Sequence, residues 1–176
     1  MSGVNAATTT LPALGRPRPT FASVAEAELD AVHGYLLFLT GDRDVAEDLT
    51  GATFEKAFRT WRRFDPRRGT PRAWLCGIAR NVALDHFRAE RRRRQREDRF
   101  AREVRAVAEP GWGEGGVAAA IGQLTPAERE VVALRVVLEL DGPTAARVLG
   151  ISATACSTRL SRALKRLEEL MSDVRV

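Results

Sequence analysis

The chain has 176 residues, of which 44% are hydrophobic, so it is long enough for one medium domain or two small ones. Its 28 basic residues outnumber 23 acidic ones, and the net charge of +5 favours a polyanionic partner without proving one. The composition argues against a disulfide framework, since only Cys76 and Cys156 occur, and against a membrane span, since no stretch approaches the roughly 20 apolar residues required.

Residues 1–20 are predicted to form a flexible tail, because they combine a threonine run with alternating proline and arginine. They lack the charged region and apolar run of a signal peptide, so we predict a soluble, cytoplasmic protein. A reducing compartment also suits the two cysteines, which we interpret as small buried hydrophobes in preference to redox sensors.

Three helices are predicted between residues 21 and 96. The first begins at a capping box, Ser23–Glu26, and ends at Gly41. Asp42 or Asp44 caps the second, and Thr70-Pro71 starts the third after a turn-rich connector. The apolar positions expected to face a core are Leu29, Val32, Leu36 and Leu37; Val45, Leu49, Phe54, Ala57, Phe58 and Trp61; and Trp74, Leu75, Ile78, Val82 and Phe87.

A linker is predicted over residues 97–117, after the dense basic run of residues 88–96. Residues 109–116 contain four glycines and a proline, which cannot sustain a helix or strand. Residues 97–108 are mixed in charge, and an extension of the third helix is an alternative there.

The last fifty residues read as a helix-turn-helix. Thr125, Pro126 and Glu128 form a capping box with a proline in the first turn. Asp141 caps a short helix that ends at Gly150. The apolar positions of the first helix are Val131, Val132, Leu134, Val136 and Leu138.

The final helix is predicted to run from Ser152 to about Met171. Basic residues recur along it at helical spacing, where a recognition helix needs contacts to DNA: Arg159, Arg162, Lys165 and Arg166. The alternative is a helical hairpin with a solvated basic face. The predicted fold is therefore all-α, with a tail (1–20), a helical domain (21–96), a flexible linker (97–117) and a helix-turn-helix domain (118–176).

Both halves also resemble one family. The matching segments are Gly41–Leu49 with Thr53-Phe54, Arg63–Pro66, Arg72–Leu75, Ile78–Asp85, Leu124–Val131, Val148–Ser152, Arg159-Leu160 and Arg162-Ala163. In this order and spacing the chain resembles an extracytoplasmic-function (ECF) sigma factor, a small two-domain member of the bacterial sigma-70 family.

The resemblance implies that the second helix docks on core RNA polymerase. Asp48, Leu49 and Ala52 match the contact positions, although the family usually has Gln-Glu where this chain has Gly51 and Ala52. The alternative for the acidic residues here is favourable charge at a helix N-terminus. A metal-dependent nuclease is a third interpretation, but the sequence offers no second set of metal ligands.

The resemblance also implies two DNA sites. Asn81 matches the position that commonly reads a flipped base of the single-stranded −10 element. Around it, Trp74 is a stacking platform or, more often at this spacing, a core residue, and the expected backbone clamps are Arg80, Arg88, Arg91 and Arg92. The positions matching the double-stranded −35 contacts are Ser157, Thr158, Arg159, Ser161, Arg162 and Lys165.

The predicted function is a transcription initiation factor with no catalytic activity, cofactor or metal. It would bind core RNA polymerase and promoter DNA and help to melt the −10 element; an anti-sigma factor is a further partner that the resemblance suggests. The alternatives are a helix-turn-helix regulator that does not bind polymerase, an enzyme such as a nuclease, and a sigma-like protein whose departures at Gly51-Ala52 and Thr154–Ser157 mark lost function.

Overall fold

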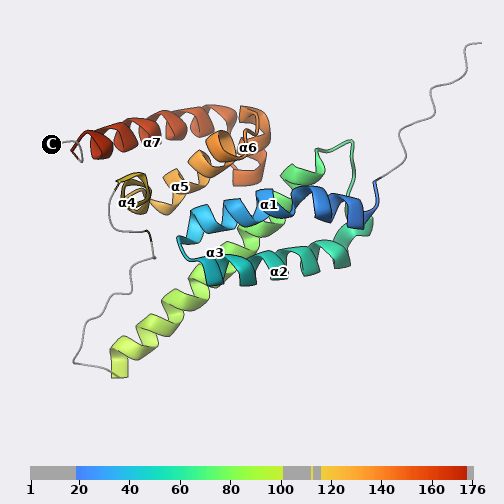
Figure 1. Ribbon diagram of the computed structural model, residues 1–176, viewed down its shortest axis with the longest axis horizontal. Helices are drawn as coiled ribbons and strands as arrows, with labels where there is room; N and C mark the ends of the chain where they lie inside the picture. Colours follow the sequence, from blue (N-terminus) through green and yellow to red (C-terminus); the bar gives the residue numbers. More distant parts are fainter. Residues whose placement is uncertain (1–18, 101–111, 113–115, 174–176) are drawn as a thin grey trace, which may run out of the picture.

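The structure is a computed structural model that describes residues 19–100, 112 and 116–173. All regular structure in these residues is helical, as predicted, and is divided between two helical domains (Figure 1). The elements are α1 (Phe21–Thr40), α2 (Arg43–Thr60), the 3₁₀ turn η1 (Trp61–Arg63), α3 (Pro71–Phe100), α4 (Gly116–Gly122), α5 (Pro126–Val132), the π-helical turn η2 (Ala133–Val137), α6 (Gly142–Leu149) and α7 (Ala153–Asp173).

The helix boundaries of the N-terminal domain follow its capping residues, with corrections at the start of α1 and at the end of α3, which runs past residue 96 to Phe100 as the helix-extension alternative allowed. The first helix begins earlier than predicted, because Thr20 and not Ser23 is the N-cap: the Thr20 hydroxyl accepts from the Ser23 amide at 3.2 Å. Gly41 ends α1 in the left-handed conformation, with φ at 67°. Asp42 caps α2 through the Val45 amide at 3.0 Å.

The core face of α1 overlaps only in part with the predicted stripe. Val32 and Leu36 are buried, but Tyr35 and Leu39 complete the stripe, whereas the predicted Leu29 is 48% exposed. On α2, similarly, Leu49 and Ala57 are buried while Phe58 is 67% exposed. The sequence therefore predicted the helices correctly, but only part of the face that each turns toward its neighbours.

Gly51 lies mid-helix in α2 on an exposed turn, and a Cβ added there would meet nothing within 4 Å. We therefore expect Gly51→Ala to stabilise the protein by about 1 kcal/mol, because alanine loses less backbone entropy in a helix. Urea denaturation would show this as a higher midpoint. Gly41→Ala is the matched contrast: its φ of 67° and a Cβ 2.7 Å from Trp112 should make it destabilising. An unchanged or lower midpoint for Gly51→Ala would contradict the expectation.

The C-terminal domain begins with α4, which was not predicted and starts within the predicted linker; the next helix, α5, begins as the sequence indicates. Thr125 and Glu128 form the full capping box. Partial burial opposes ionisation of Glu128, but hydrogen bonds from the Thr125 amide and hydroxyl outweigh it and lower its pKa. Asp141 caps α6 by accepting from Thr144, which lowers the pKa of Asp141. Gly150, with φ at 69°, turns the chain toward α7.

One predicted core position is wrong because of the π-helical turn η2. The extra residue per turn rotates the chain, so Val136 is 51% exposed while Leu134 and Leu138 remain buried. Val137 is also exposed. The turn thus places two valines on the surface of the C-terminal domain.

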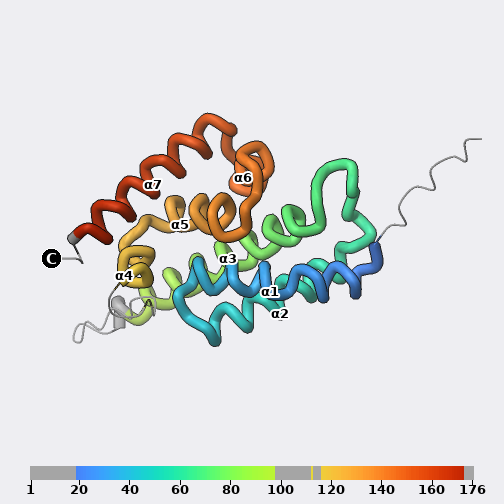
Figure 2. Tube along the Cα trace, turned by 45° about the horizontal axis from the view of Figure 1, so that its top comes forward, coloured from blue at the N-terminus to red at the C-terminus, as the bar shows by residue number. Residues whose placement is uncertain are grey.

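The two domains pack against each other. The C-terminal helices lie along one side of the α1–α3 bundle (Figure 2), where α6 contacts α3, and α5 and η2 contact α1. The buried apolar residues of both domains form one continuous cluster. This arrangement places the recognition helix α7 on the outside and α6 beside the start of α3.

Candidate nucleic-acid interface

The final helix α7 presents a polar outer face. Cys156 and Ala163 are buried against the rest of the domain, and the Ser152 hydroxyl accepts from the Ala155 amide at 3.1 Å to start the helix. The residues predicted to contact the −35 element lie on the remaining surface, where Arg159 is half-buried and the others are exposed: Ser157, Thr158, Arg159, Ser161, Arg162 and Lys165. Thr158, Arg159 and Arg162 also line a shallow depression with the start of α5.

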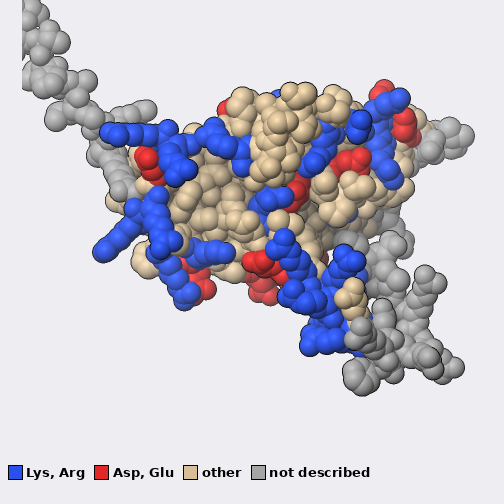
Figure 3. Space-filling view, turned by 180° about the vertical axis from the view of Figure 1, so that it is seen from behind, with Lys and Arg blue, Asp and Glu red and all other residues tan. Residues whose placement is uncertain are grey.

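The second half of α3 carries the basic run. Arg88, Arg91 and Arg92 are exposed on it, and Arg88 pairs with Asp85 at 3.3 Å. Figure 3 shows Lys and Arg side chains gathered at this projecting end of the molecule. Exposed guanidinium groups carry the positive charge that neutralises the phosphates of a nucleic-acid backbone.

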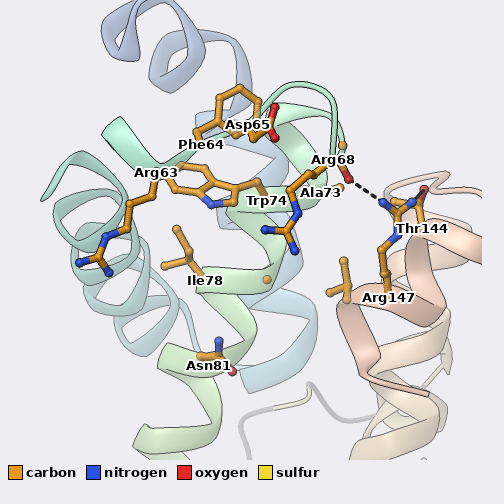
Figure 4. Close-up of a pocket in the computed structure, with 13 residues that line it drawn as sticks. Arg63, Phe64, Asp65, Arg68, Ala73, Trp74, Ile78, Asn81, Thr144 and Arg147 are labelled. Atoms are coloured by element: carbon orange, nitrogen blue, oxygen red, sulfur yellow. Dashed lines mark hydrogen bonds between the residues drawn. The ribbon is translucent and has the colours of Figure 1, made fainter. Parts of the chain in front are cut away.

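A pocket of about 500 Å³ lies at the start of α3 (Figure 4). On one side it is lined by the connector after η1 and by Trp74, Ile78 and Asn81 of α3; on the other side lie Thr144 and Arg147 of α6. Asn81 is exposed, so its amide can donate and accept there. The pocket therefore brings the predicted base-reading amide together with part of the second domain.

Trp74 fits the core interpretation better than the stacking platform. Its ring packs at 5.6 Å edge-on against Trp61 and at 5.4 Å against Phe64, while Trp61 and Phe64 stack at 4.9 Å. This aromatic cluster fixes the connector that forms the pocket wall. Trp74 also lines the pocket, so one face of the cluster borders it.

Arg80 lies away from the other predicted backbone clamps. Its side chain pairs with Glu130 of α5, with Nε and Oε1 3.2 Å apart and Nη2 donating to Oε2 at the same distance. Both side chains are largely buried between the domains. In this arrangement the Arg80 guanidinium is engaged by a carboxylate of the C-terminal domain.

The three residues predicted to contact polymerase separate into two groups. Asp48 and Ala52 are exposed one turn apart on α2, and no hydrogen bond or ion pair engages Asp48 within the described chain. Leu49 is only 7% exposed and belongs to the core. The surface available for a partner is thus formed by Asp48 and Ala52. The acidic residues of this region form no metal-binding group with the other side chains that the structure describes.

Cys76 is fully buried, and this burial, with the nearby Glu28 carboxylate, raises the pKa of its thiol to about 12. At pH 8 the thiolate fraction should be about 1000-fold lower than for an unperturbed thiol with a pKa near 9. We expect a thiol reagent to label Cys76 only after denaturation. Between pH 9 and 12 stability should fall, because the unfolded thiol ionises first. Rapid labelling of the native protein at pH 8 would contradict this.

Three residues at the contact between the domains were missed by sequence reasoning: Trp112, Arg129 and Arg147. Arg129 donates to the carbonyl oxygen of Leu39, and Arg147 to that of Arg68. A lone tryptophan in a glycine-rich linker is a signal that could have indicated Trp112. The two arginines carry no comparable signal, because each lies in an ordinary helical segment.

Together, the two packed helical domains and the exposed basic face of α7 define a helix-turn-helix DNA-binding protein. Family models agree with this class: Sigma-70 region 2 matches residues 24–93, and Sigma-70 region 4 matches residues 115–167. No described helix is long and apolar enough to cross a membrane.

Three relatives make the assignment specific. The ECF RNA polymerase sigma factor BldN of Streptomyces coelicolor is 32% identical over 160 residues, covering 87% of this chain and 61% of BldN. CnrH of Cupriavidus metallidurans is 33% identical over 170 residues, covering 84% and 86%. The structure of RpoE from Bartonella quintana, in complex with the anti-sigma factor NepR, has a TM-score of 0.73 and 27% identity, covering 86% and 96%. The chain belongs to the ECF sigma factors of the sigma-70 family.

Proposed function

We propose that this chain is a transcription initiation factor that binds core RNA polymerase and directs it to promoters through two separate DNA elements. The observation that carries the proposal is the pairing of two exposed surfaces on separate domains: α3, with Asn81 in its first half and the basic run in its second half, and the polar face of α7. A single-domain regulator needs only the second surface. The factor contributes no catalytic chemistry and acts in the cytoplasm, where its polymerase is.

In this proposal α2 binds the polymerase. Asp48 and Ala52 present an exposed strip on α2, and the buried Leu49 supports it from below. A carboxylate that no other described residue engages is available to pair with a basic surface of the polymerase.

The DNA contacts follow from the two remaining surfaces. The pocket beside Asn81 receives a base of the −10 element that has left the stack, and Arg88, Arg91 and Arg92 hold the adjoining backbone. Helix α7 enters the major groove at the −35 element. Because the two modules are tethered, each raises the effective concentration of the other on DNA that carries both elements at the correct spacing.

An anti-sigma factor is a further partner in this proposal. The structure of RpoE contains the anti-sigma factor NepR, and a structure of CnrH contains the cytosolic domain of CnrY. The folds of these two neighbours match 86% and 87% of this chain, so a partner of the same kind has a comparable surface to bind here.

The test combines polymerase binding with transcription. Purified core polymerase is expected to bind the chain without DNA and, on fragmented DNA from the source genome, to give run-off transcripts that share a two-part motif. Asp48→Ala should weaken polymerase binding, whereas Asp30→Ala, an exposed aspartate on α1, should not. Failure to bind polymerase would overturn the proposal in favour of a helix-turn-helix regulator.

A further inference from the structure

Arg129 of α5 connects the two domains from a buried position. Its guanidinium donates to the carbonyl oxygens of Leu39, at 3.1 Å, Leu124, at 3.0 Å, and Gly122, at 3.3 Å. Leu39 lies in the last turn of α1, where helical carbonyls have no partner within the helix. Burial lowers the pKa of Arg129, yet a guanidinium keeps its proton. A charge of the C-terminal domain therefore caps a helix of the N-terminal domain.

Trp112, between the domains in the sequence, packs on this same contact. Its ring lies 5.1 Å from the Arg129 guanidinium and 5.9 Å, edge-on, from Phe38 of α1. Two glycines leave room for it: a Cβ at Gly41 would lie 2.7 Å from the indole, and one at Gly122 would lie 3.1 Å from the Trp112 side chain. Trp112 thus touches α1, α4 and α5 together.

The packing of the two domains also shapes the pocket that contains Asn81. While the domains are packed together, α6 forms the second wall of the pocket, and Arg147 donates to the Arg68 carbonyl oxygen at 2.6 Å across it (Figure 4). Arg80 is at the same time held by Glu130. Both features leave less room and less free charge for a nucleic-acid strand at α3.

We propose that Trp112 and Arg129 form a latch that holds the two domains closed, with α6 across the Asn81 pocket. The proposal rests on the proposed function for the role of that pocket in binding single-stranded DNA. A partner that displaces the Trp112 ring from Arg129 releases the latch. The other contacts between the described parts of the domains include the Arg80–Glu130 pair, the Arg147 hydrogen bond and apolar packing.

The first test measures the separation of the domains in the full chain alone. Spin labels at Ala27→Cys on α1 and Glu169→Cys on α7 occupy exposed positions, whereas the native Cys76 and Cys156 are buried and stay unlabelled. Trp112→Ala should raise the population with separated domains roughly tenfold, as expected for removal of a desolvated cation–π interaction and its ring packing. Gly122→Ala, whose Cβ would press on the ring at 3.1 Å, should raise it to a smaller extent.

The controls are chosen to separate opening from unfolding. Gly51→Ala introduces the same side chain as Gly122→Ala, but in open space on α2, and should leave the distance distribution unchanged. Circular dichroism should show full helicity in every variant. Distance distributions identical to the wild type in both Trp112→Ala and Gly122→Ala would overturn the latch.

The second test asks whether closure restricts the pocket. A fluorescent single-stranded oligonucleotide of mixed sequence should bind Trp112→Ala about tenfold more tightly than wild type, matching the gain in open molecules. If the domains separate in Trp112→Ala but its affinity for the oligonucleotide is unchanged, α6 does not restrict DNA binding at the pocket. Since the distance measurement uses neither polymerase nor DNA, failure of the latch and failure of the proposed function are distinguishable.

Discussion

Replacing Arg159 and Arg162 together with alanine is expected to abolish recognition of the −35 element. Both side chains lie on the outer face of α7, Arg162 exposed and Arg159 half-buried, and alanine favours a helix, so the helix should be retained. Each specific arginine contact to a base is worth about 1–3 kcal/mol, so promoter affinity of the reconstituted holoenzyme should fall about 100-fold or more. Equilibrium binding to the promoter found by run-off transcription measures this.

The matched control keeps the charge and changes only its shape. Replacing both arginines with lysine retains two cations but removes the planar fork that binds a base edge or phosphate bidentately. The lysine variant should therefore keep the salt dependence of DNA binding but lose sequence specificity. The alanine variant should reduce the slope of log K against log salt by about 0.9 for each phosphate that is no longer neutralised. If the alanine variant instead binds the promoter within about twofold of the wild-type affinity, α7 does not recognise the −35 element.

The sequence predicted the ends of the helices better than their faces. Thr125, Asp141 and Gly150 act as predicted because a cap depends on backbone groups within four residues of it. The buried face of α1 was only partly predicted, since Leu29 is exposed and Tyr35 buried. Which side of a helix is covered depends on the neighbours it meets, and several apolar residues on one helix permit more than one stripe.

The residues of the candidate site also differ in how far the sequence predicts them. The exposure of Asn81 and Arg162 follows from helical periodicity, which a sequence displays. The interdomain contacts do not: Arg129 and Leu39 are 90 residues apart, and Arg147 and Arg68 are 79 apart. Nothing local to these arginines distinguishes them from solvated ones, so only the packed arrangement identifies them.

Arg129→Met is expected to lower the free energy of unfolding by about 3 kcal/mol, because it leaves three carbonyl acceptors without their donor and each unsatisfied buried group costs about 1–3 kcal/mol. Methionine preserves most of the apolar volume, so the decrease reports the guanidinium and not a cavity. The carbonyls of Gly122 and Leu124 belong to the C-terminal domain and that of Leu39 to α1, so both the turn before α5 and the end of α1 should loosen. Urea denaturation followed by circular dichroism measures the change.

Arg147→Ala provides the contrast that makes this decrease interpretable. Its bond to the Arg68 carbonyl oxygen also joins the domains, but it lies in solvent, where water replaces a missing donor, so its cost should stay near about 0.5–1.5 kcal/mol. Both variants lose an interdomain hydrogen bond, but only Arg129→Met loses a buried one. The difference between their free energies of unfolding therefore measures the effect of burial. Equal decreases in the free energy of unfolding would mean that water reaches the carbonyls around Arg129 once the guanidinium is gone. The buried hydrogen bonds of Arg129 would then contribute no more to stability than an exposed contact does.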